Sequence, residues 1–338
     1  MKALIIGGTG TISSAVVDLL IEKKWEIYVL NRGTKSVPKG VAHIAVDIND
    51  EETARKKLDG MTFDVVCEFI GFVPAQVERD YRLFKGKTNQ YIYISSASAY
   101  HKPSRNYIVN EGTALANPYW QYSRDKIACE EFLMKMYREN GFPVTIVRPS
   151  HTYDENNIPI GVHGKNGFWQ VIKRMQENKP VIIQGDGTSL WTLTFNTDFA
   201  VGFVGLMGNV HAIGEAFQIT SDETLSWNQI YETIAQALGV ELHPYYVASD
   251  FLDSVAPEYD YKGSLTGDKS VSVVFDNSKL KRAVPEYKPD ISFAKGVRIA
   301  LDNILKKTEC QKEDPEFDAW CDKVINALEN AKAEFKKG

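Results

Sequence analysis

The sequence predicts an α/β protein with a doubly wound parallel sheet and a smaller mixed α/β domain in its C-terminal half. Two observations carry this prediction. Short apolar runs, several of them β-branched, alternate with helical patterns up to about residue 150, and a glycine-rich turn follows the first run directly. Such alternation places the carboxyl ends of all strands at one edge of the sheet, where ligands bind.

The individual elements follow from the apolar periodicity. The strands are expected at Ala3–Ile6, Glu26–Leu30, Ala42–Val46, Asp64–Cys67, Tyr91–Ser95 and Val144–Val147. The helices are expected near Ile12–Lys23, Glu51–Leu58, Pro74–Phe84, Gln121–Asn140, Phe168–Gln176, Asp198–Met207 and Trp227–Leu238. We assign one domain to residues 1–150, with segments near 185–210 and 270–277 as candidates for returning to it. A second domain spans 151–310, and an amphipathic helix spans 311–338.

Composition and charge exclude several classes of protein. The 338 residues are 43% hydrophobic and 25% charged, as in a globular protein, and the net charge of −5 argues against a broad nucleic-acid footprint. The four cysteines form no CxxC pair and are expected to be reduced thiols. The six histidines form no HxH or HExxH pattern, so no metal is expected. Without a signal peptide or a bilayer-length apolar run, a cytoplasmic location is expected.

The glycine-rich turn lies in MKALIIGGTGTIS, Met1–Ser13, with the spacing Gly7-x-x-Gly10-x-x-Ser13. Glycines let the backbone turn tightly and bring N–H groups to a pyrophosphate at the N-terminus of a helix. Ser13 replaces a frequent third glycine and is small enough for close helix–strand packing. The alternative is a glycine turn without a ligand, but the strand before it and the helix after it favour dinucleotide binding.

The ends of the next two strands bear on the choice of nucleotide. The second strand ends at Asn31 and Arg32, where an acidic residue would favour NAD and an arginine can pair with the 2′-phosphate of NADP. Arg32 therefore favours NADP, unless it is only a solvated loop charge. Asp47 follows the third strand and is a candidate either for accepting from the adenine amino group or for capping a helix.

A candidate catalytic group comes from two later segments. YIYISSASAY, Tyr91–Tyr100, is a strand that runs into small hydroxyl residues, and Tyr122 and Lys126 lie four residues apart on one helix face. Hydride transfer at a carbinol carbon requires a proton to move, and a lysine ammonium brings the tyrosine pKa closer to working pH. Ser96 would orient the reacting oxygen. A YxxxK spacing alone also arises by chance, but here it accompanies the glycine turn and the serine-ended strand.

These motifs together resemble the extended short-chain dehydrogenase/reductase family, specifically its NAD-dependent epimerase/dehydratase branch, over residues 1–305. The resemblance rests on GGTGTIS at 7–13, ISSASAY at 94–100, YSRDK at 122–126, IVRPSHTYD at 146–154, GDGTSLWTLTFNTDFA at 185–200 and VVFDNSKLKR at 273–282. It implies a Rossmann-type NAD(P)-binding domain followed by a substrate domain. By position, Ser96, Tyr122 and Lys126 match the catalytic residues of the family.

The resemblance also implies the binding residues. The expected cofactor contacts are Gly7, Gly10, Thr11, Ile12, Asn31, Arg32, Asp47, Ile48, Phe69, Ile70, Gly71, Lys126, Pro149 and Ser150. The expected substrate contacts are Phe72, Ser96, Ala97, Ser98, His151 and Trp191.

The sequence departs from relatives that act on nucleotide sugars. Such relatives usually have an arginine where this chain has Trp191, and often another before the Gly-Asp that here follows Ser264-Leu265-Thr266. Arginine forks are natural partners of a diphosphate, so their absence weakens the case for a nucleotide-diphospho-sugar. Trp191 is equally compatible with a sugar-stacking wall and with a core residue.

The expected function is an NAD(P)-dependent enzyme of the epimerase/dehydratase type, acting by hydride transfer on a sugar, a sugar nucleotide or a related polyhydroxylated compound. Retention of the cofactor would give epimerisation or dehydration, and exchange would give a dehydrogenase or reductase. One alternative is an NADPH-dependent reductase of a non-sugar carbonyl compound. The other is a non-catalytic relative like the chloroplast stem-loop RNA-binding proteins, against which the intact catalytic group and acidic charge argue. A homodimer through the helices at Pro74–Phe84 and Gln121–Asn140 is also expected.

Overall fold

The computed structural model describes residues 1–337 and divides the chain into two compact units. Unit 1 contains Met1–Thr152, Thr192–Asp222 and Val274–Ile291, and unit 2 contains Tyr153–Trp191, Glu223–Val273 and the chain from Ser292 onward. The chain therefore leaves unit 1 and returns to it twice.

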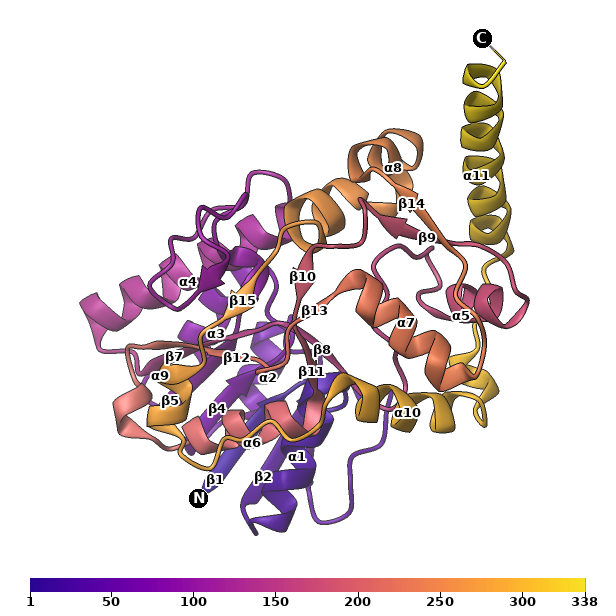
Figure 1. Ribbon diagram of the computed structural model, residues 1–338. Helices are drawn as coiled ribbons and strands as arrows, with labels where there is room; N and C mark the ends of the chain where they lie inside the picture. The colour runs from indigo at the N-terminus through magenta and orange to yellow at the C-terminus, as the bar shows by residue number, and fades with distance from the viewer. Residues whose placement is uncertain (338) are drawn as a thin grey trace. The chain divides into compact units, whose positions relative to one another are not determined.

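Unit 1 is built on a seven-stranded sheet with the order β12-β7-β5-β4-β1-β2-β3, in which all paired strands are parallel. Its strands are β1 (Lys2–Ile6), β2 (Glu26–Asn31), β3 (Ala42–Ala45), β4 (Phe63–Glu68), β5 (Thr88–Ile94), β7 (Val144–Pro149) and β12 (Ala216–Ile219). The predicted doubly wound parallel fold is thus confirmed (Figure 1). Because β1 lies between β2 and β4, the strand order reverses there, and a crevice for ligands opens at the carboxyl ends of these strands.

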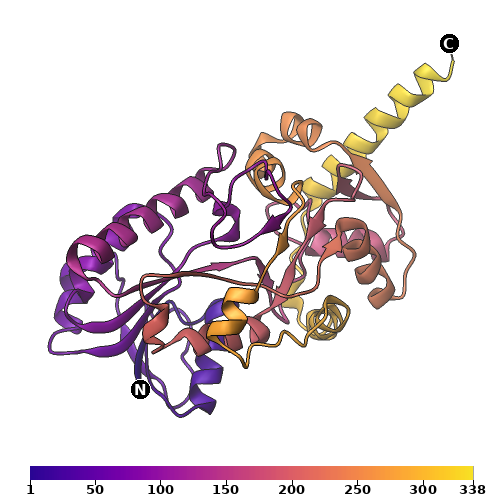
Figure 2. The ribbon, with the colours of Figure 1, turned by 60° about the vertical axis from the view of Figure 1, so that its left-hand side comes forward.

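Two helical layers cover the sheet of unit 1, and they can be followed in Figures 1 and 2. One core packs α1 (Thr11–Glu22), α6 (Asn196–Leu206) and α9 (Ser278–Ala283) on one face of the sheet. The other core packs α2 (Glu51–Lys57), α3 (Pro74–Phe84) and α4 (Gln121–Asn140) on the opposite face. Burial on both faces explains why the strands are continuous apolar runs rather than alternating ones.

Short elements complete unit 1. They are the strands β6 (Ile108–Val109), β8 (His151–Tyr153, whose last residue belongs to unit 2), β11 (Leu193–Phe195) and β15 (Val274–Phe275). β15 pairs with β6 in parallel, so the returning segment is hydrogen-bonded to the loop that precedes α4.

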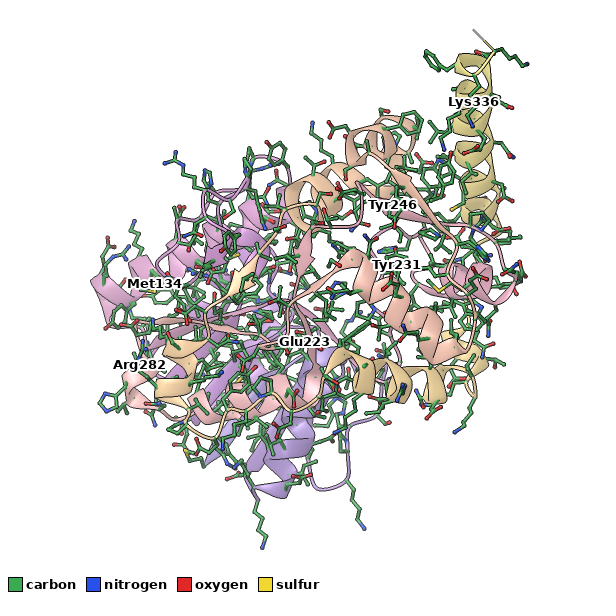
Figure 3. The ribbon with its side chains drawn as sticks, viewed as in Figure 1. Met134, Glu223, Tyr231, Tyr246, Arg282 and Lys336 are labelled. Carbon is green, nitrogen blue, oxygen red and sulfur yellow. The ribbon has the colours of Figure 1, made fainter. Side chains whose placement is uncertain are left out.

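Unit 2 is a mixed α/β arrangement. Its helices are α5 (Trp169–Gln176), α7 (Trp227–Leu238), α8 (Ser249–Val255), α10 (Phe293–Ile304) and α11 (Pro315–Phe335), with a π-helix at Lys262–Lys269. Its strands β9 (Val181–Gln184) and β14 (Pro244–Val247) pair in parallel, and β10 (Leu190–Trp191) pairs antiparallel with β13 (Leu225–Ser226). Figure 3 labels Tyr231 of α7. Tyr231 is fully buried, and its hydroxyl accepts the Gly161 amide at 3.3 Å.

The start of α11 is held by charge as well as by apolar burial. The Asp314 side chain caps the helix, and Phe317 is buried. Arg174 of α5, only 1% exposed, forms ion pairs with Asp318 at 2.6 Å and Asp322 at 2.7 Å. Within residues 1–337, no helix is both long enough and apolar enough to span a bilayer.

Candidate functional site

The turn between β1 and α1 depends on two glycines with left-handed backbones, Gly7 at φ +103° and Gly8 at φ +70°. A Cβ at Gly8 would stand 2.7 Å from Val29 Cγ1, so no other residue fits that position without displacement. Gly10 is the N-cap of α1, and its amide donates to Ser13 Oγ at 3.0 Å. Ser13 therefore stabilises the turn where the motif often has a third glycine.

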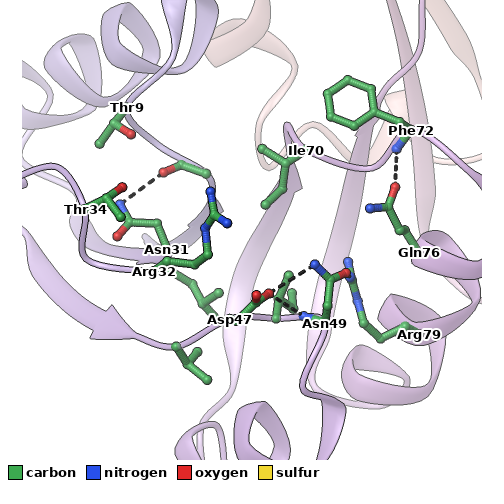
Figure 4. A pocket seen from close by; sticks show the side chains of 14 residues that line it. Thr9, Asn31, Arg32, Thr34, Asp47, Asn49, Ile70, Phe72, Gln76 and Arg79 are labelled. Carbon is green, nitrogen blue, oxygen red and sulfur yellow. Dashed lines mark hydrogen bonds between the residues drawn. The ribbon is translucent and has the colours of Figure 1, made fainter. Parts of the chain in front are cut away.

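A cavity of about 370 Å³ opens beside this turn, at the carboxyl ends of the strands of unit 1 (Figure 4). Seven of its lining residues are among the predicted site residues: Gly7, Asn31, Arg32, Asp47, Ile48, Ile70 and Phe72. The structure thus brings together residues from the four turns that follow β1, β2, β3 and β4. Its other lining residues are Thr9, Leu30, Thr34, Val46, Asn49, Gln76 and Arg79.

Asn31 connects the end of β2 to the glycine turn. Its amide nitrogen donates to the Gly7 carbonyl at 3.3 Å, and its amide oxygen accepts the Gly33 amide at 2.8 Å. The neutral side chain thus occupies the position from which a carboxylate would bind the adenosine ribose. Arg32 follows it directly and is exposed in the same cavity.

Asp47 follows β3 and organises the next turn. Its Oδ1 accepts the Asn49 amide at 2.9 Å and the Asn49 side chain at 3.1 Å. The N-cap of α2 is Asp50, which accepts the Thr53 amide at 3.1 Å, so the capping alternative for Asp47 is wrong. Asp47 remains an exposed carboxylate on the cavity wall.

Lys126 is buried at the carboxyl ends of β4 and β5. It is 1% exposed, and its Nζ donates to the Gly71 and Ile94 carbonyl oxygens, both at 2.7 Å. Burial disfavours the ammonium and lowers the pKa of Lys126 to about 8. The Nζ also lies 4.8 Å from the Phe72 ring centre, so the exposed Phe72 ring covers the charge.

Tyr122 lies one helical turn before Lys126, at the start of α4. Its ring centre is 5.7 Å from Lys126 Nζ and 4.9 Å from the centre of the Trp120 ring. The turn that leads into the helix is set by the buried Asn117, whose Oδ1 accepts the amides of Tyr119 at 3.1 Å and Trp120 at 3.2 Å. The aromatic contact and this turn fix where the Tyr122 phenol stands.

Ser96 ends a chain of three hydroxyl groups. Ser123 of α4 donates to Ser98 Oγ at 2.7 Å, and the Ser98 and Ser96 hydroxyls lie 2.9 Å apart. The Ser98 amide also donates to Ser96 Oγ at 3.1 Å. Either hydroxyl of the Ser96–Ser98 pair can be the donor, and when Ser98 donates, the Ser96 hydroxyl proton is available to a ligand oxygen.

Comparison with known proteins identifies the family of this chain. The family model "NAD dependent epimerase/dehydratase family" matches residues 3–220. The chain belongs to this family. The family prediction, and with it the prediction of an enzyme, are confirmed, while the residues of the site remain predictions.

The chain is also similar to two curated relatives and to one solved structure. The chain is 24% identical to 2′-dehydrokanamycin reductase of Streptomyces kanamyceticus over 85% of this chain and 80% of that protein. It is also 24% identical to the chloroplast stem-loop binding protein of 41 kDa b of Arabidopsis thaliana over 70% of this chain and 63% of that protein. The structure of UDP-glucuronic acid 4-epimerase from Bacillus cereus in complex with NAD aligns with a TM-score of 0.69 at 20% identity, covering 90% of this chain and 97% of that one.

Several predicted residues of this family member lie outside the cavity. Thr11 and Ile12 begin α1, where the Thr11 carbonyl accepts from Asn196 at 3.1 Å. Phe69 is partly buried and packs against the core, with its ring centre 5.2 Å from that of Phe203. Ala97 lies in the short helix after Ser96.

The remaining predicted residues follow β7 or lie in unit 2. Pro149 ends β7, Ser150 Oγ lies 3.0 Å from Thr194 Oγ1, and His151 begins β8. Trp191 belongs to unit 2, where it is 6% exposed and stacks on Trp227 with ring centres 6.0 Å apart. Contacts of these residues with a ligand stay predictions.

The seven other cavity residues were not anticipated from the sequence, and three of them, Asn49, Gln76 and Arg79, hold the cavity wall through their side chains. Gln76 Oε1 accepts the Phe72 amide at 2.6 Å and so holds the loop after β4 (Figure 4). Arg79 Nη1 donates to Asn49 Oδ1 at 2.6 Å. The i, i+3 spacing of Gln76 and Arg79 on one helix was the available signal, because it places both on one face of α3.

Proposed function

We propose that Ser96, Tyr122 and Lys126 catalyse proton transfer coupled to hydride transfer at a carbinol or carbonyl carbon. The substrate class is a sugar, a sugar nucleotide or a related polyhydroxylated compound. The observation that carries this proposal is the buried Lys126, held by two carbonyl oxygens one helical turn from Tyr122, in a member of the NAD-dependent epimerase/dehydratase family.

The residues around the cavity fit a nicotinamide dinucleotide. The positive-φ glycine turn at the N-terminus of α1 suits a pyrophosphate, and the cavity along β2 and β3 is lined by Ile48 and Asp47, which suit an adenine. The bound nicotinamide would supply the hydride acceptor or donor.

Tyr122, Lys126 and Ser96 would share the proton transfer and the orientation of the substrate. In the oxidising direction, Tyr122 takes the proton of the substrate hydroxyl as a hydride leaves the same carbon, and in the reducing direction it returns that proton. The Lys126 ammonium stabilises the phenolate form of Tyr122. Ser96 would donate a hydrogen bond from its hydroxyl to the reacting oxygen, while the Ser98 amide donates to Ser96 Oγ.

A second observation favours NADP over NAD. The end of β2 presents a neutral Asn31 and a cationic, exposed Arg32 to the cavity. Asn31 is neutral and so does not repel a 2′-phosphate as a carboxylate would, and the Arg32 guanidinium can pair with that phosphate. This supports the alternative of an exchanging NADPH-dependent reductase, and the relative from Streptomyces kanamyceticus is named as a reductase.

The Tyr122→Phe variant tests the catalytic assignment. Tyr137→Phe, near the far end of α4, is the matched control. We expect turnover of a sugar or carbonyl panel to fall by about 10²–10⁴-fold in the first variant and to stay unchanged in the second. Unchanged turnover in Tyr122→Phe would contradict the assignment.

Identification of the cofactor separates the candidate functions. The purified protein is denatured, and any released nicotinamide is identified by chromatography. Stoichiometric NAD supports a retained cofactor and an epimerase or dehydratase, whereas an empty protein that binds NADPH supports a reductase. Binding of neither supports a non-catalytic relative, such as an RNA-binding protein. A homodimer through α3 and α4 stays a prediction that sedimentation can test.

A further inference from the structure

Glu68, the last residue of β4, is a fully buried carboxyl group that the proposed reaction does not use. Its side chain is 0% exposed and folds against the turn that leads into α3. Glu68 Oε1 accepts the Ile70 amide at 2.5 Å, and a Cβ at Gly71 would stand only 3.0 Å from Glu68 Cγ. An ionised carboxylate in such a place is costly unless a cation pairs with it.

The cation beside Glu68 is already paired with another carboxylate. Arg79 Nη2 lies 3.7 Å from Glu68 Oε2 but 2.8 Å from Asp80 Oδ1. Asp80 is also buried, and its Oδ2 accepts the Tyr91 hydroxyl at 2.8 Å. Within residues 1–337, nothing donates a hydrogen bond to Glu68 Oε2. The single guanidinium of Arg79 thus faces two buried carboxyl groups, and Asp80 is its closer partner.

The turn that Glu68 holds connects the cofactor cavity to the catalytic lysine. The Ile70 side chain lines the cavity, and the Gly71 carbonyl accepts Lys126 Nζ at 2.7 Å and the Tyr93 hydroxyl at 3.2 Å. Moving this turn would therefore displace both a wall of the cavity and a hydrogen-bond partner of Lys126.

We propose that Glu68 is a positioning residue that works as a neutral carboxylic acid and holds the Ile70–Gly71 turn against Lys126. Oε1 keeps its role as acceptor for the Ile70 amide, and a proton on Oε2 turns the contact with the Asp80 carboxylate from repulsion into a hydrogen bond. The positioning role rests on the proposed function, because it acts through Lys126.

The surroundings of Glu68 make this protonation state the favoured one. Burial raises the pKa of Glu68 well above its ordinary value, and the Asp80 charge raises it further. The other titratable groups around it are Cys67 on β4, Arg79 and Asp80 on α3, Tyr91 and Tyr93 on β5, and Lys126 on α4. Burial raises the pKa values of the thiol and both phenols, so these groups stay neutral, and Lys126 with a pKa of about 8 stays charged below pH 7.

Stability should therefore depend on pH with a definite sign. In the unfolded chain Glu68 titrates near its ordinary pKa of about 4.3, so between pH 5 and 7 the folded state binds more protons than the unfolded state. The contribution of Glu68 to stability is complete below pH 4 and declines as the pH rises. A glutamine keeps the shape of the neutral acid and has no such decline.

The first experiment compares the melting temperatures of the wild type and Glu68→Gln from pH 5 to 7. We expect the difference, variant minus wild type, to increase steadily with pH. A flat or decreasing difference overturns the neutral acid, because an ionised Glu68 that pairs with Arg79 gives the opposite trend. Asp80→Asn is the matched control, and it should melt below the wild type at every pH because it leaves Arg79 without its ionised partner.

The second experiment measures NADPH and NADH binding by fluorescence titration for Glu68→Leu and Glu68→Gln. Leucine removes the acceptor of the Ile70 amide, so we expect Glu68→Leu to weaken nucleotide binding by about tenfold. Glutamine keeps an acceptor, so we expect the affinity of Glu68→Gln to lie within about threefold of the wild-type affinity. The alkaline limb of the pH–rate profile should shift with leucine and not with glutamine. Wild-type binding by the leucine variant, or equal weakness of both, overturns the positioning role. If the wild type binds neither nucleotide, the proposed function fails, and the melting experiment still decides the state of Glu68.

Discussion

Two regions at one edge of the sheet differ in the burial of their charged side chains. The charges are exposed at the ends of β2 and β3 and buried at the ends of β4 and β5. Arg32 and Asp47, after β2 and β3, are exposed, and Asp47 accepts hydrogen bonds from Asn49 in its own turn. Glu68 and Lys126, at the ends of β4 and β5, are 0% and 1% exposed. Solvent screens the exposed charges, whereas burial raises the pKa of Glu68 and lowers the pKa of Lys126 by desolvation.

This difference in burial suggests that the ends of β2 and β3 select the nucleotide, whereas the ends of β4 and β5 hold the lysine proposed for catalysis. A solvated arginine can be replaced with little effect on the fold, so the strand ends of β2 and β3 can change their nucleotide preference independently. A buried lysine must be held by carbonyl groups from two strand ends, and its burial reduces stability. The predictions below test whether the two regions behave in this way.

The largest expected effect is the loss of activity in Lys126→Met. The apolar side chain fills the same space but cannot stabilise a phenolate at Tyr122, so we expect turnover to fall by about 10²–10⁴-fold. Steady-state kinetics with the accepted substrate measures this. Lys135→Met, at an exposed position of the same helix, is the control and should retain wild-type turnover. Equal turnover in both variants would place the chemistry elsewhere.

Lys126 should also leave a signature in stability. Its folded-state pKa of about 8 lies below its unfolded value, so between pH 8 and 10 the unfolded state binds more protons and stability rises with pH. Complete titration amounts to about 3 kcal/mol for a shift of this size. Urea unfolding of the wild type from pH 7.5 to 10 should show this rise, and Lys126→Met should lack it. A wild type whose stability does not rise more than that of the variant would contradict the burial of the ammonium.

A smaller and more selective effect is expected at the end of β2. Arg32→Ala should weaken NADPH binding by about tenfold and leave NADH binding nearly unchanged, because only the 2′-phosphate needs the guanidinium. Asn31→Asp should shift the preference toward NADH. Isothermal titration with both nucleotides measures these changes, with the exposed loop variant Lys39→Ala as the control. An equal loss for both nucleotides would show that Arg32 does not read the phosphate.

The smallest effect is expected from Ser123→Ala. This change removes the proton donated to Ser98 at 2.7 Å and so weakens the hydroxyl chain that ends at Ser96. We expect kcat to fall by about threefold with KM nearly constant, because one neutral hydrogen bond behind the reacting oxygen is lost. A change confined to KM would indicate that the chain serves substrate binding instead.

Much of unit 1 could be predicted because its elements are local in sequence. The expected ranges of α3 and α4 agree with the observed ones, since proline begins α3 and a left-handed Gly141 ends α4. β12 was not predicted, because its pairing with β7 depends on a partner far away in the sequence. The π-helix at Lys262–Lys269 was also not predicted, because apolar periodicity predicts α-helices and strands and not i→i+5 helices.

The sequence by itself determined the parallel sheet, the glycine turn and the spacing of Tyr122 and Lys126 on one helical turn. The glycine turn and the Tyr122–Lys126 spacing depend on residues that are close in sequence, and the parallel sheet was inferred from the alternation of local strand and helix patterns. Only the tertiary structure decided that Arg79 reaches Asn49 and that Glu68 meets Asp80 behind the Gly71 carbonyl. These contacts join elements brought together by strand order and burial, and burial in turn decides which of the titratable groups keep their charge.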